Sequence, residues 1–515
     1  MHGMKKMSTF WRLSTLLLVG ILTLVVAGCG GGKAGDDKKT LIYATASDAV
    51  KLDPQMMTDV PSYNMTNHKI YETLVDLDKD GKFKPYLATE WKNIDPVTWE
   101  FKLQKNVKFH DGTPMNAAAV KKTFERLMDP KEKKAQQQML QAVKEIKVID
   151  DTTLQIITKE PSPTLLQSLT HNSTAIISPK SIDDHKNKSL DQNPVGTGPY
   201  KLEKWTKGES MTLALFPEYW GKKPTVEKLV FKVVPEDATR MGMLKSGEAH
   251  IADKLPFNDV EAYAKDTKLQ VIRTQGYGTE FLGFNLKKDI FKDVRVRQAI
   301  DLAIDREAIR MGVYKGIGDA GVSSLAPKVF GHNPNLPKAE YNLEKAKALL
   351  AEAGVTNLSF TLWTSTNNKA RIKVAEIVQD QLKKAGINVT IKTLEWGVFL
   401  KAYQDGETDM YILGWSNSTG DAEYSMRIWS ESGFGTINGS FYSTPEMETL
   451  LDQGSKEMDR EKRLKIYWKA QEVATNSHAR LIYRTTDYVS LASAKVKGIY
   501  FTPGEILLPE TLTIE

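Results

Sequence analysis

A group of small polar residues follows a short apolar run, and no other part of the chain is better suited to hold a ligand. Residues 410–415 are apolar and rich in β-forming types, which predicts a buried strand ending at Trp415. The polar side chains that follow include Ser416, Ser418, Thr419 and Asp421. Hydroxyl groups and a carboxylate at the carboxyl end of a strand are typical of ligand sites in open α/β sheets. The alternative is a polar loop above a core tryptophan.

A second polar segment could hold a carboxylate group. Ser365 and Asn367 lie in a short polar run that leads into a helix predicted to start at Lys369. The amides and hydroxyl groups at the positive end of that helix, helped by Arg371, are suited to a negatively charged group. The alternative is that Ser365 or Asn368 only caps the helix.

Trp396 supplies aromatic surface after a predicted strand at 389–394. Its indole could form an apolar wall for a ligand side chain. A tryptophan buried in the core is the alternative.

The sequence contains no pattern that predicts catalysis or metal binding. The eight histidines are scattered without a pair at i, i+4, and the single cysteine is Cys29, so no zinc site is expected. No G-x-S-x-G elbow is present. Residues 316–321 fit G-x-G-x-x-G but follow a predicted helix, so the strand context of a dinucleotide site is missing. We expect no catalytic residue, no metal and no cofactor.

The polar segments are positioned by a repeating order of strands and helices. Strands are predicted at 358–363, 389–394 and 410–415, and helices at about 369–385 and from 396. Elements that alternate at these lengths form right-handed βαβ crossovers and a mostly parallel sheet. The chain is therefore predicted to be an α/β protein.

Other helices are predicted from their ends and apolar spacing. A helix is expected around 63–74, and another over 342–352 that Gly354 closes. Asp293 stands where a helix cap belongs, because apolar residues at helical spacing begin at Val296.

The N-terminus has the pattern of an export signal with a lipid anchor. Three basic residues precede an apolar stretch at 16–27, which is too short to span a bilayer. The stretch runs into Cys29 through two small residues and resembles a bacterial lipobox, where the leader is cut and the cysteine receives lipid. We expect a lipoprotein signal peptide at 1–28 and a flexible tether at 29–39. An ordinary signal peptide is the alternative.

Charge and composition limit the class of partner. The chain has 515 residues, with 70 Lys and Arg against 64 Asp and Glu, and a formal net charge of +6. The charges are interspersed without a basic block, so no nucleic-acid partner is expected. No second apolar run reaches about 18 residues, so the body of the chain is expected outside the membrane.

Six motifs occur in a fixed order along the chain. They are Pro85-x-Leu87-Ala88-x-x-Trp91, Thr98-Trp99-x-Phe101-x-Leu103, Val107-Lys108-Phe109-His110-Asp111-Gly112-x-Pro114, Gly196-Thr197-Gly198-Pro199-Tyr200, Phe284-Asn285 and Asp293-Val294-Arg295-Val296-Arg297-Gln298-Ala299-Ile300. Together they resemble the family 5 extracellular solute-binding proteins, the peptide- and nickel-class receptors of ATP-driven importers. The resemblance covers residues 40–515.

This resemblance implies an α/β fold of the periplasmic-binding-protein-like type II, with two lobes joined by a hinge. The implied limits are 40–60, 190–284 and 491–515 for lobe I, 61–189 for an extra domain of lobe I, and 285–490 for lobe II. Chain crossings near Asn285 and Ser490 would form the hinge, and the lobes would close over a ligand.

The resemblance also bears on the ligand. In di- and oligopeptide-binding members, an aspartate three residues after the tryptophan pairs with the ligand's α-ammonium group, and here that place is Ser418. The run 414–423 looks instead like the glutathione-binding branch, with its acid at Asp421. We therefore predict that Asp421 receives the ammonium group, since a buried ammonium without a carboxylate would cost several kcal/mol. The alternative is that Asp421 caps the following helix.

The predicted function is that of a lipid-anchored, extracytoplasmic and monomeric receptor. It would capture glutathione or a related short peptide between two lobes, with aromatic walls at Trp396 and Trp415, and deliver it to a permease with cytoplasmic ATPase subunits. A general di- or oligopeptide receptor and a nickel- or haem-type carrier are alternatives within the family. A hydrolase and a surface adhesin or signalling receptor are alternatives outside it.

Overall fold

The computed structural model describes residues 39–515 except 133, 185–189, 367 and 418. The predicted signal peptide, most of the tether and the lipidation site Cys29 lie outside the described residues. So do the predicted ligand residues Asn367 and Ser418.

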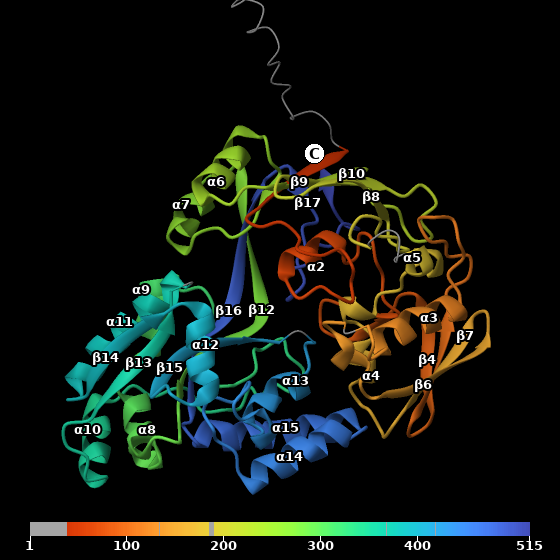
Figure 1. The fold of residues 1–515 in the computed structure, drawn as a ribbon. Helices are drawn as coiled ribbons and strands as arrows, with labels where there is room; N and C mark the ends of the chain where they lie inside the picture. The colour runs from red at the N-terminus through yellow and green to blue at the C-terminus, as the bar shows by residue number, and fades with distance from the viewer. Residues whose placement is uncertain (1–38, 133, 185–189, 367, 418) are drawn as a thin grey trace, which may run out of the picture.

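Two long antiparallel strands connect the two lobes of the molecule (Figure 1). They are β12 (Leu269–Phe284) and β16 (Arg480–Ser493). Their pairing runs from Leu269 opposite Ser493 to Gly283 opposite Arg480, and its register shifts between Gln275 and Thr279. The segments on the two sides of this shift pair with different neighbours, so each lobe contains one half of both strands.

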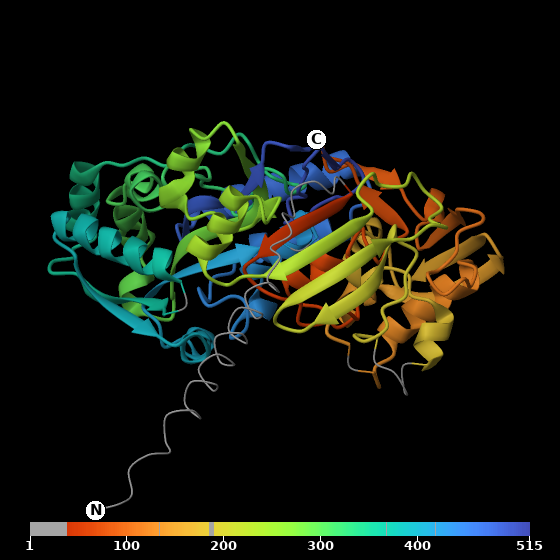
Figure 2. The ribbon, with the colours of Figure 1, turned by 90° about the horizontal axis from the view of Figure 1, so that it is seen from above.

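A single ten-stranded sheet therefore extends through both lobes in the order β14-β13-β15-β12-β16-β11-β1-β10-β9-β8. On the β16 side the strands are β1 (Thr40–Thr45), β8 (Tyr200–Thr206), β9 (Ser210–Leu215), β10 (Lys228–Val233) and β11 (Ile251–Ala252). On the β12 side they are β13 (Ser359–Ser365), β14 (Asn388–Leu394) and β15 (Met410–Ser416). Figure 2 shows β1 beside the other strands of its own lobe.

The strands on the β12 side follow the predicted parallel order. β13 pairs in parallel with β14 and with β15, whereas β15 pairs antiparallel with β12. The sheet as a whole is mixed, because β8, β9 and β10 are also joined by antiparallel pairs.

A separate four-stranded antiparallel sheet lies at the far side of the first lobe (Figure 1), in the order β4-β5-β7-β6. Its strands are β4 (Ala88–Asp95), β5 (Thr98–Leu103), β6 (Val143–Asp150) and β7 (Thr153–Thr158). Its core is continuous with helix α3 (Ala117–Met128) and includes Phe101, Phe124 and Ile156. Short strand pairs join β2 (Val75–Leu77) to β3 (Phe83–Pro85) and β17 (Val496–Lys497) to β18 (Thr513–Ile514).

The remaining helices surround these sheets (Figure 1). In the first lobe they are α2 (Val60–Thr66), α4 (Leu165–Ser168), α5 (Pro179–Asp184), α6 (Asp237–Ser246) and α7 (Val260–Ala264). In the second they are α8 (Val294–Leu302), α9 (Arg306–Tyr314), α10 (Leu343–Glu352), α11 (Lys369–Lys384), α12 (Trp396–Asp405), α13 (Ala422–Met426), α14 (Pro445–Lys456) and α15 (Arg460–Asn476).

Several predicted helix ends are confirmed, and one predicted helix is largely wrong. Asp293 caps α8 through a hydrogen bond from the Arg295 amide. The helix expected around 63–74 ends at Thr66 as α2, because Asn67 is extended and His68 has a φ of 59°. A histidine in that left-handed region cannot continue an α-helix.

The glycine-rich run at 316–321 has a structural role at the β16 strand. Gly318 has a φ of +80°, and a Cβ atom there would lie 2.2 Å from the Thr485 carbonyl oxygen. The Asp319 amide donates to the Thr485 hydroxyl at 2.9 Å. The segment is a loop that follows α9 and not a strand, as the sequence predicted.

Among the described residues, none of the helices combines the length and apolar character that a bilayer crossing requires.

Two glycines give a stability test of this packing. A Cβ atom at Gly196 would lie 2.1 Å from the Ile70 carbonyl oxygen, whereas one at Gly242 in α6 meets nothing within 4 Å. We expect Gly196→Ala to destabilise the protein by more than about 3 kcal/mol, because rigid backbone must move. Gly242→Ala is the matched control and should stabilise by about 0.5–1 kcal/mol. Urea unfolding measures both, and equal effects would contradict the close packing at Gly196.

Candidate functional site

The polar loop that follows β15 lies at the segment where the chain passes between the lobes. Trp415 and Ser416 at the end of β15 pair with Thr279 and Gly278 of β12. These β12 residues border the register shift in the β12–β16 pair. The side chain of Tyr488, on β16, interacts with Ser416. The tip of β15 is therefore beside both connecting strands.

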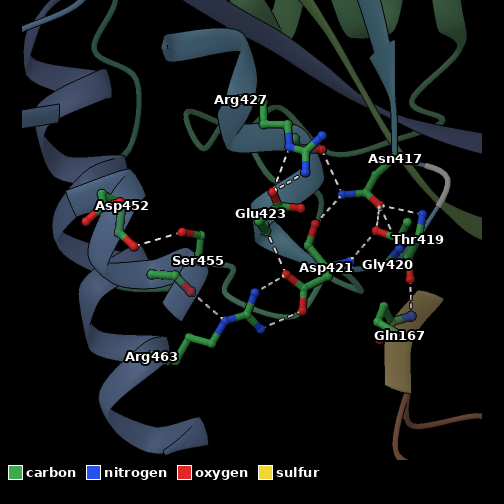
Figure 3. A network of polar contacts seen from close by, with 12 residues as sticks. Gln167, Asn417, Thr419, Gly420, Asp421, Glu423, Arg427, Asp452, Ser455 and Arg463 are labelled. Carbon is green, nitrogen blue, oxygen red and sulfur yellow. Dashed lines mark hydrogen bonds and ion pairs between the residues drawn. The ribbon is translucent and has the colours of Figure 1, made fainter. Parts of the chain in front are cut away.

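Asn417 organises the described part of this loop (Figure 3). Its side-chain oxygen accepts hydrogen bonds from the amides of Thr419 and Gly420 at 3.0 and 2.6 Å. Its side-chain amide donates to the Asp421 carbonyl and to the Ser425 hydroxyl. A buried amide that satisfies four groups fixes the loop, so several of its polar atoms are used internally.

Asp421 is buried and forms a two-pronged ion pair with Arg463 of α15 (Figure 3). Arg463 Nη1 lies 2.7 Å from Oδ2 and Nη2 lies 2.6 Å from Oδ1. Oδ1 also accepts the Glu423 amide, so Asp421 caps α13. Burial lowers the pKa of Arg463, but Asp421 outweighs burial and raises it. The pair leaves little negative charge for a ligand.

This geometry matches the alternative reading of Asp421, that of a helix cap. It gives no support to the predicted ammonium contact, because the carboxylate already neutralises a buried guanidinium. Arg463 is 42 residues away in the sequence, so no local pattern indicated the partner.

The same loop touches the extra sheet's side of the first lobe. The Gln167 side-chain amide, at the end of α4, donates to the Thr419 carbonyl. A cavity of about 560 Å³, including its opening to solvent, lies at this contact and is lined by Gln138, Gln141, Gln167, Thr419 and Glu423 among others. The Thr419 carbonyl therefore faces the opposite lobe, whereas its hydroxyl group bonds within the loop.

Glu423 is a second acid at this cavity and is half-buried. Burial raises the pKa of Glu423, and its ion pair with Arg427 opposes that rise. Like Asp421, this carboxylate is already paired within its own lobe.

Arg371 is arranged differently from these acids. Its Nε donates to Glu280 Oε1 at 3.1 Å, and Glu280 Oε2 accepts from Arg484 Nη1 at 2.8 Å. Glu280 and Arg484 are cross-strand neighbours on β12 and β16. One buried carboxylate therefore serves two guanidinium groups. Burial lowers the pKa of Arg371 and Glu280 raises it, and the net shift is upward.

The outer nitrogens of Arg371 remain available. Within the described residues, Nη1 and Nη2 of Arg371 have no hydrogen-bond partner, and 16% of the side chain is exposed. A Cβ atom at Gly414 would lie 2.3 Å from Nη2, which places the guanidinium against β15 next to Trp415. This arrangement can bind an anion such as a carboxylate.

The predicted carboxylate segment before α11 is only partly as expected. Asn368, not Ser365, caps α11 by accepting the Arg371 amide at 3.1 Å. Ser365 is buried at the end of β13, and Leu394 on β14 is its register partner. The capping alternative therefore holds for Asn368, while the Arg371 side chain points to the hinge strands.

The two tryptophans differ in their surroundings. Trp396 is 36% exposed at the start of α12 and packs its ring against Phe399. It is not a core tryptophan, so its surface is open to contact. Trp415 is half-buried against Tyr424, with ring centroids 5.7 Å apart, and its Nε1 lacks a hydrogen-bond partner among the described residues.

A second cavity, in the first lobe, was not indicated by the sequence. It measures about 480 Å³ including its opening, and its lining includes Tyr43, Asp253, Tyr488 and Glu505. These residues come from β1, a loop after β11, β16 and the C-terminal segment, so only folding brings them together.

Within the described residues, no group of three or more His, Cys, Asp or Glu side chains could hold a metal ion.

Comparison with protein families identifies the class of protein. Residues 82–436 match the model described as bacterial extracellular solute-binding proteins, family 5 middle. The chain belongs to this family. It is a solute-binding receptor of the extracytoplasmic class, and its fold is that of the type II periplasmic binding proteins.

Relatives of this family 5 protein align over nearly its whole length. The glutathione-binding protein GsiB of Escherichia coli strain K12 is 28% identical over 95% of this chain and 96% of the relative. HbpA2 from Haemophilus parasuis is 27% identical, with a TM-score of 0.84 over 92% of this chain and 100% of that one. DppA from Helicobacter pylori, solved with the peptide STSA, is 30% identical, with a TM-score of 0.76 over 92% of this chain and 98% of that one.

The buried pair of Asp421 and Arg463 yields a stability prediction. Asp421→Ala should destabilise the receptor by about 3–5 kcal/mol, because it leaves a buried guanidinium unpaired. Replacing both residues, as Asp421→Ala with Arg463→Met, should recover a large part of that loss. Urea unfolding of the single and double variants measures the coupling.

The control is Asp452→Ala, which removes an exposed partner of Lys456 and should cost less than about 1 kcal/mol. If Asp421→Ala cost no more than this control, the ion pair would not be the main role of Asp421.

Proposed function

We propose that this receptor binds a short zwitterionic peptide between its lobes, with glutathione as the preferred ligand, and delivers it to an ABC-importer permease. The observation that carries the proposal is that the two outer nitrogens of Arg371, which lie against the end of β15, have no hydrogen-bond partner among the described residues. A peptide carboxylate provides two oxygens for its two outer nitrogens. No chemical step is proposed, and the solute is released unchanged.

The charge balance around Glu280 supports the carboxylate site. Glu280 is the only acid that forms an ion pair with Arg371 or Arg484 in the described part of the chain. Asp487 is close enough to interact electrostatically with Arg484 but forms no ion pair with it. The cluster thus holds one more guanidinium than paired carboxylate, and a ligand carboxylate would complete it.

The names of relatives favour a peptide-like ligand. GsiB is described as glutathione-binding, and the Helicobacter DppA structure holds a peptide. A glutathione molecule has two carboxylates and one ammonium group, so it needs both anion- and cation-binding groups. In this proposal Trp396 and Trp415 would give apolar contact to the ligand, and the hydroxyl groups of Ser416 and Thr419 would form hydrogen bonds with it.

The lobe limits given above remain our proposal for the moving units. Lobe I would comprise 40–60, 190–284 and 491–515, the extra domain 61–189, and lobe II 285–490. The two connecting strands would flex near their register shift and let the lobes close. The contact of Gln167 with Thr419 would then belong to the closed face.

A general di- or oligopeptide receptor is the second candidate. It is favoured by the cavity between the lobes at Gln167 and Thr419, because such space can take side chains of different size. A nickel- or haem-type carrier has less support, since the described residues contain no cluster of metal-ligating side chains.

Removing the Arg371 guanidinium tests the proposed carboxylate site. Arg371→Met should weaken glutathione binding by tenfold or more, about 1.4 kcal/mol or greater, through loss of a charge-assisted contact. Isothermal titration calorimetry of the wild type and the variant measures this change. Glu280 retains Arg484 in the variant, so the fold should remain intact.

Arg295→Met is the matched control, because Arg295 lies on the surface of α8 and pairs with Asp293. It should leave the affinity unchanged. Unchanged affinity in Arg371→Met would remove this residue from the site, and a wild type that binds neither glutathione nor other short peptides would reject the proposed function.

We also propose that the receptor is a monomer and that lipid on Cys29 anchors it to the outer side of a membrane. Cys29→Ser should abolish labelling by a radioactive fatty acid and release the receptor or leave its precursor uncut, because a hydroxyl cannot replace the thiol as lipid acceptor. Labelling of cells followed by membrane fractionation measures both effects. Normal labelling of the variant would exclude the anchor.

A further inference from the structure

Two acids that lie outside the proposed carboxylate site line the cavity of the first lobe beside the connecting strands. Asp253 follows β11, and Glu505 lies in the C-terminal segment, 252 residues later in the chain. Tyr43, Tyr488 and Phe501 provide aromatic walls of the same cavity. Carboxylates combined with aromatic faces favour a cation over an anion or a neutral group.

The two acids are not equivalent. Asp253 accepts hydrogen bonds from the Thr45 hydroxyl and the Ala46 amide, and Arg240 Nε lies 3.3 Å from its Oδ1. Glu505 forms no ion pair within the described residues, and the Tyr488 hydroxyl donates a hydrogen bond to its carboxylate. Glu505 is therefore the carboxylate of this cavity that still has capacity for a cation.

Lys254 is the nearest competing cation. It also lines the cavity and acts on Glu505 electrostatically, but it is exposed and forms no ion pair with Glu505. Its ammonium group therefore stays largely hydrated. A ligand cation buried next to Glu505 would interact with its carboxylate more strongly than the hydrated ammonium group of Lys254 does.

The backbone at both residues is held in a restricted conformation. Glu505 has a φ of 64° and Lys254 a φ of 53°, in a region that residues other than glycine rarely adopt. Hydrogen bonds from the Glu505 amide to the Thr502 carbonyl and from the Thr502 amide to the Ile506 carbonyl fix the turn. The Glu505 side chain is thus presented from a defined turn.

We propose that this cavity is the subsite for the ligand's primary ammonium group, with Glu505 as its carboxylate partner and Tyr488 and Phe501 as its walls. The inference rests on the proposed function, since it names the second charged end of the same peptide. Glu505 takes the role of ammonium partner that the sequence predicted for Asp421, because the Asp421 carboxylate is bound to Arg463.

The spacing of the two charged ends suits a short peptide. Glu505 interacts with Tyr488, and Arg484, which shares Glu280 with Arg371, is four residues earlier on β16. Four residues of extended strand span on the order of 13 Å. An extended tripeptide measures on the order of 10 Å, and the side chains of the site reach toward it from both ends.

The ionisation of Glu505 gives the subsite a pH dependence. Burial raises the pKa of Glu505 to about 7, Lys254 opposes the rise and Asp253 adds to it. Tyr43 and Tyr488, which also face it, stay neutral because burial raises the pKa of each. The carboxylate is therefore mostly charged at pH 8 and mostly neutral at pH 6, so ammonium binding should weaken about tenfold between these values.

Calorimetry with glutathione and N-acetylglutathione tests the subsite, because acetylation removes only the ammonium charge. At pH 8 the wild type should prefer glutathione by tenfold or more, and Glu505→Gln should abolish this preference and its pH dependence. Glu248→Gln, at an exposed position of the same lobe, is the control and should keep both. A preference that survives in Glu505→Gln overturns the inference.

Lys254→Gln is a second test, in which the affinity for glutathione should change in the opposite direction. This test does not require Glu505→Gln to fold. Removing the competing cation should tighten glutathione binding several-fold, and unchanged or weaker binding would count against the subsite.

If the wild type bound neither peptide, the proposed function would fail and butylammonium chloride would test the subsite alone. A rise in melting temperature at pH 8 in the wild type but not in Glu505→Gln supports the subsite without the peptide function. No rise, or the same rise in both proteins, rejects it.

Discussion

The pairing of β12 with β16 is the constraint on which the rest of the structure depends. These two strands carry the chain between the lobes, and each lobe completes its part of the sheet on one half of the pair. The ion pair between Glu280 and Arg484 joins them just beyond the register shift. The shift leaves three β12 residues without a partner on β16, so bending is easiest there. The proposed ligand groups lie on both sides of it.

Some charged groups near this segment already have an ion-pair partner within the protein, and others keep capacity for a ligand contact. Asp421 is buried and Glu423 is half-buried, and each has an arginine partner in its own lobe. Removing Arg463 would leave a costly buried charge at Asp421. Arg371 and Glu505 keep capacity for a further contact. A binding protein needs charged groups with such remaining capacity, because only these groups gain a partner when a solute enters.

The loop after β15 illustrates how stability and recognition share one segment. Asn417 uses its amide to hold the loop, and Asp421 fastens it to α15. The Thr419 carbonyl, in contrast, faces the first lobe and meets Gln167. The described part of the loop is therefore held by its own side chains, which suits the proposed site, because a preorganised site costs less free energy on binding.

The sequence by itself determined the local elements and the class of protein. The strands at 358–363, 389–394 and 410–415, the cap at Asp293 and the family motifs all depend on neighbouring residues. The helix expected around 63–74 was wrong after Thr66, because a left-handed residue at His68 is set by packing and not by propensity. Tertiary structure alone decided the partners of the charged side chains: Asp421 with Arg463, Arg371 with Glu280, and Glu505 with the cavity of the first lobe. Helix and strand formation is governed by local spacing, but the state of a buried charge depends on groups that only folding brings within a few ångströms.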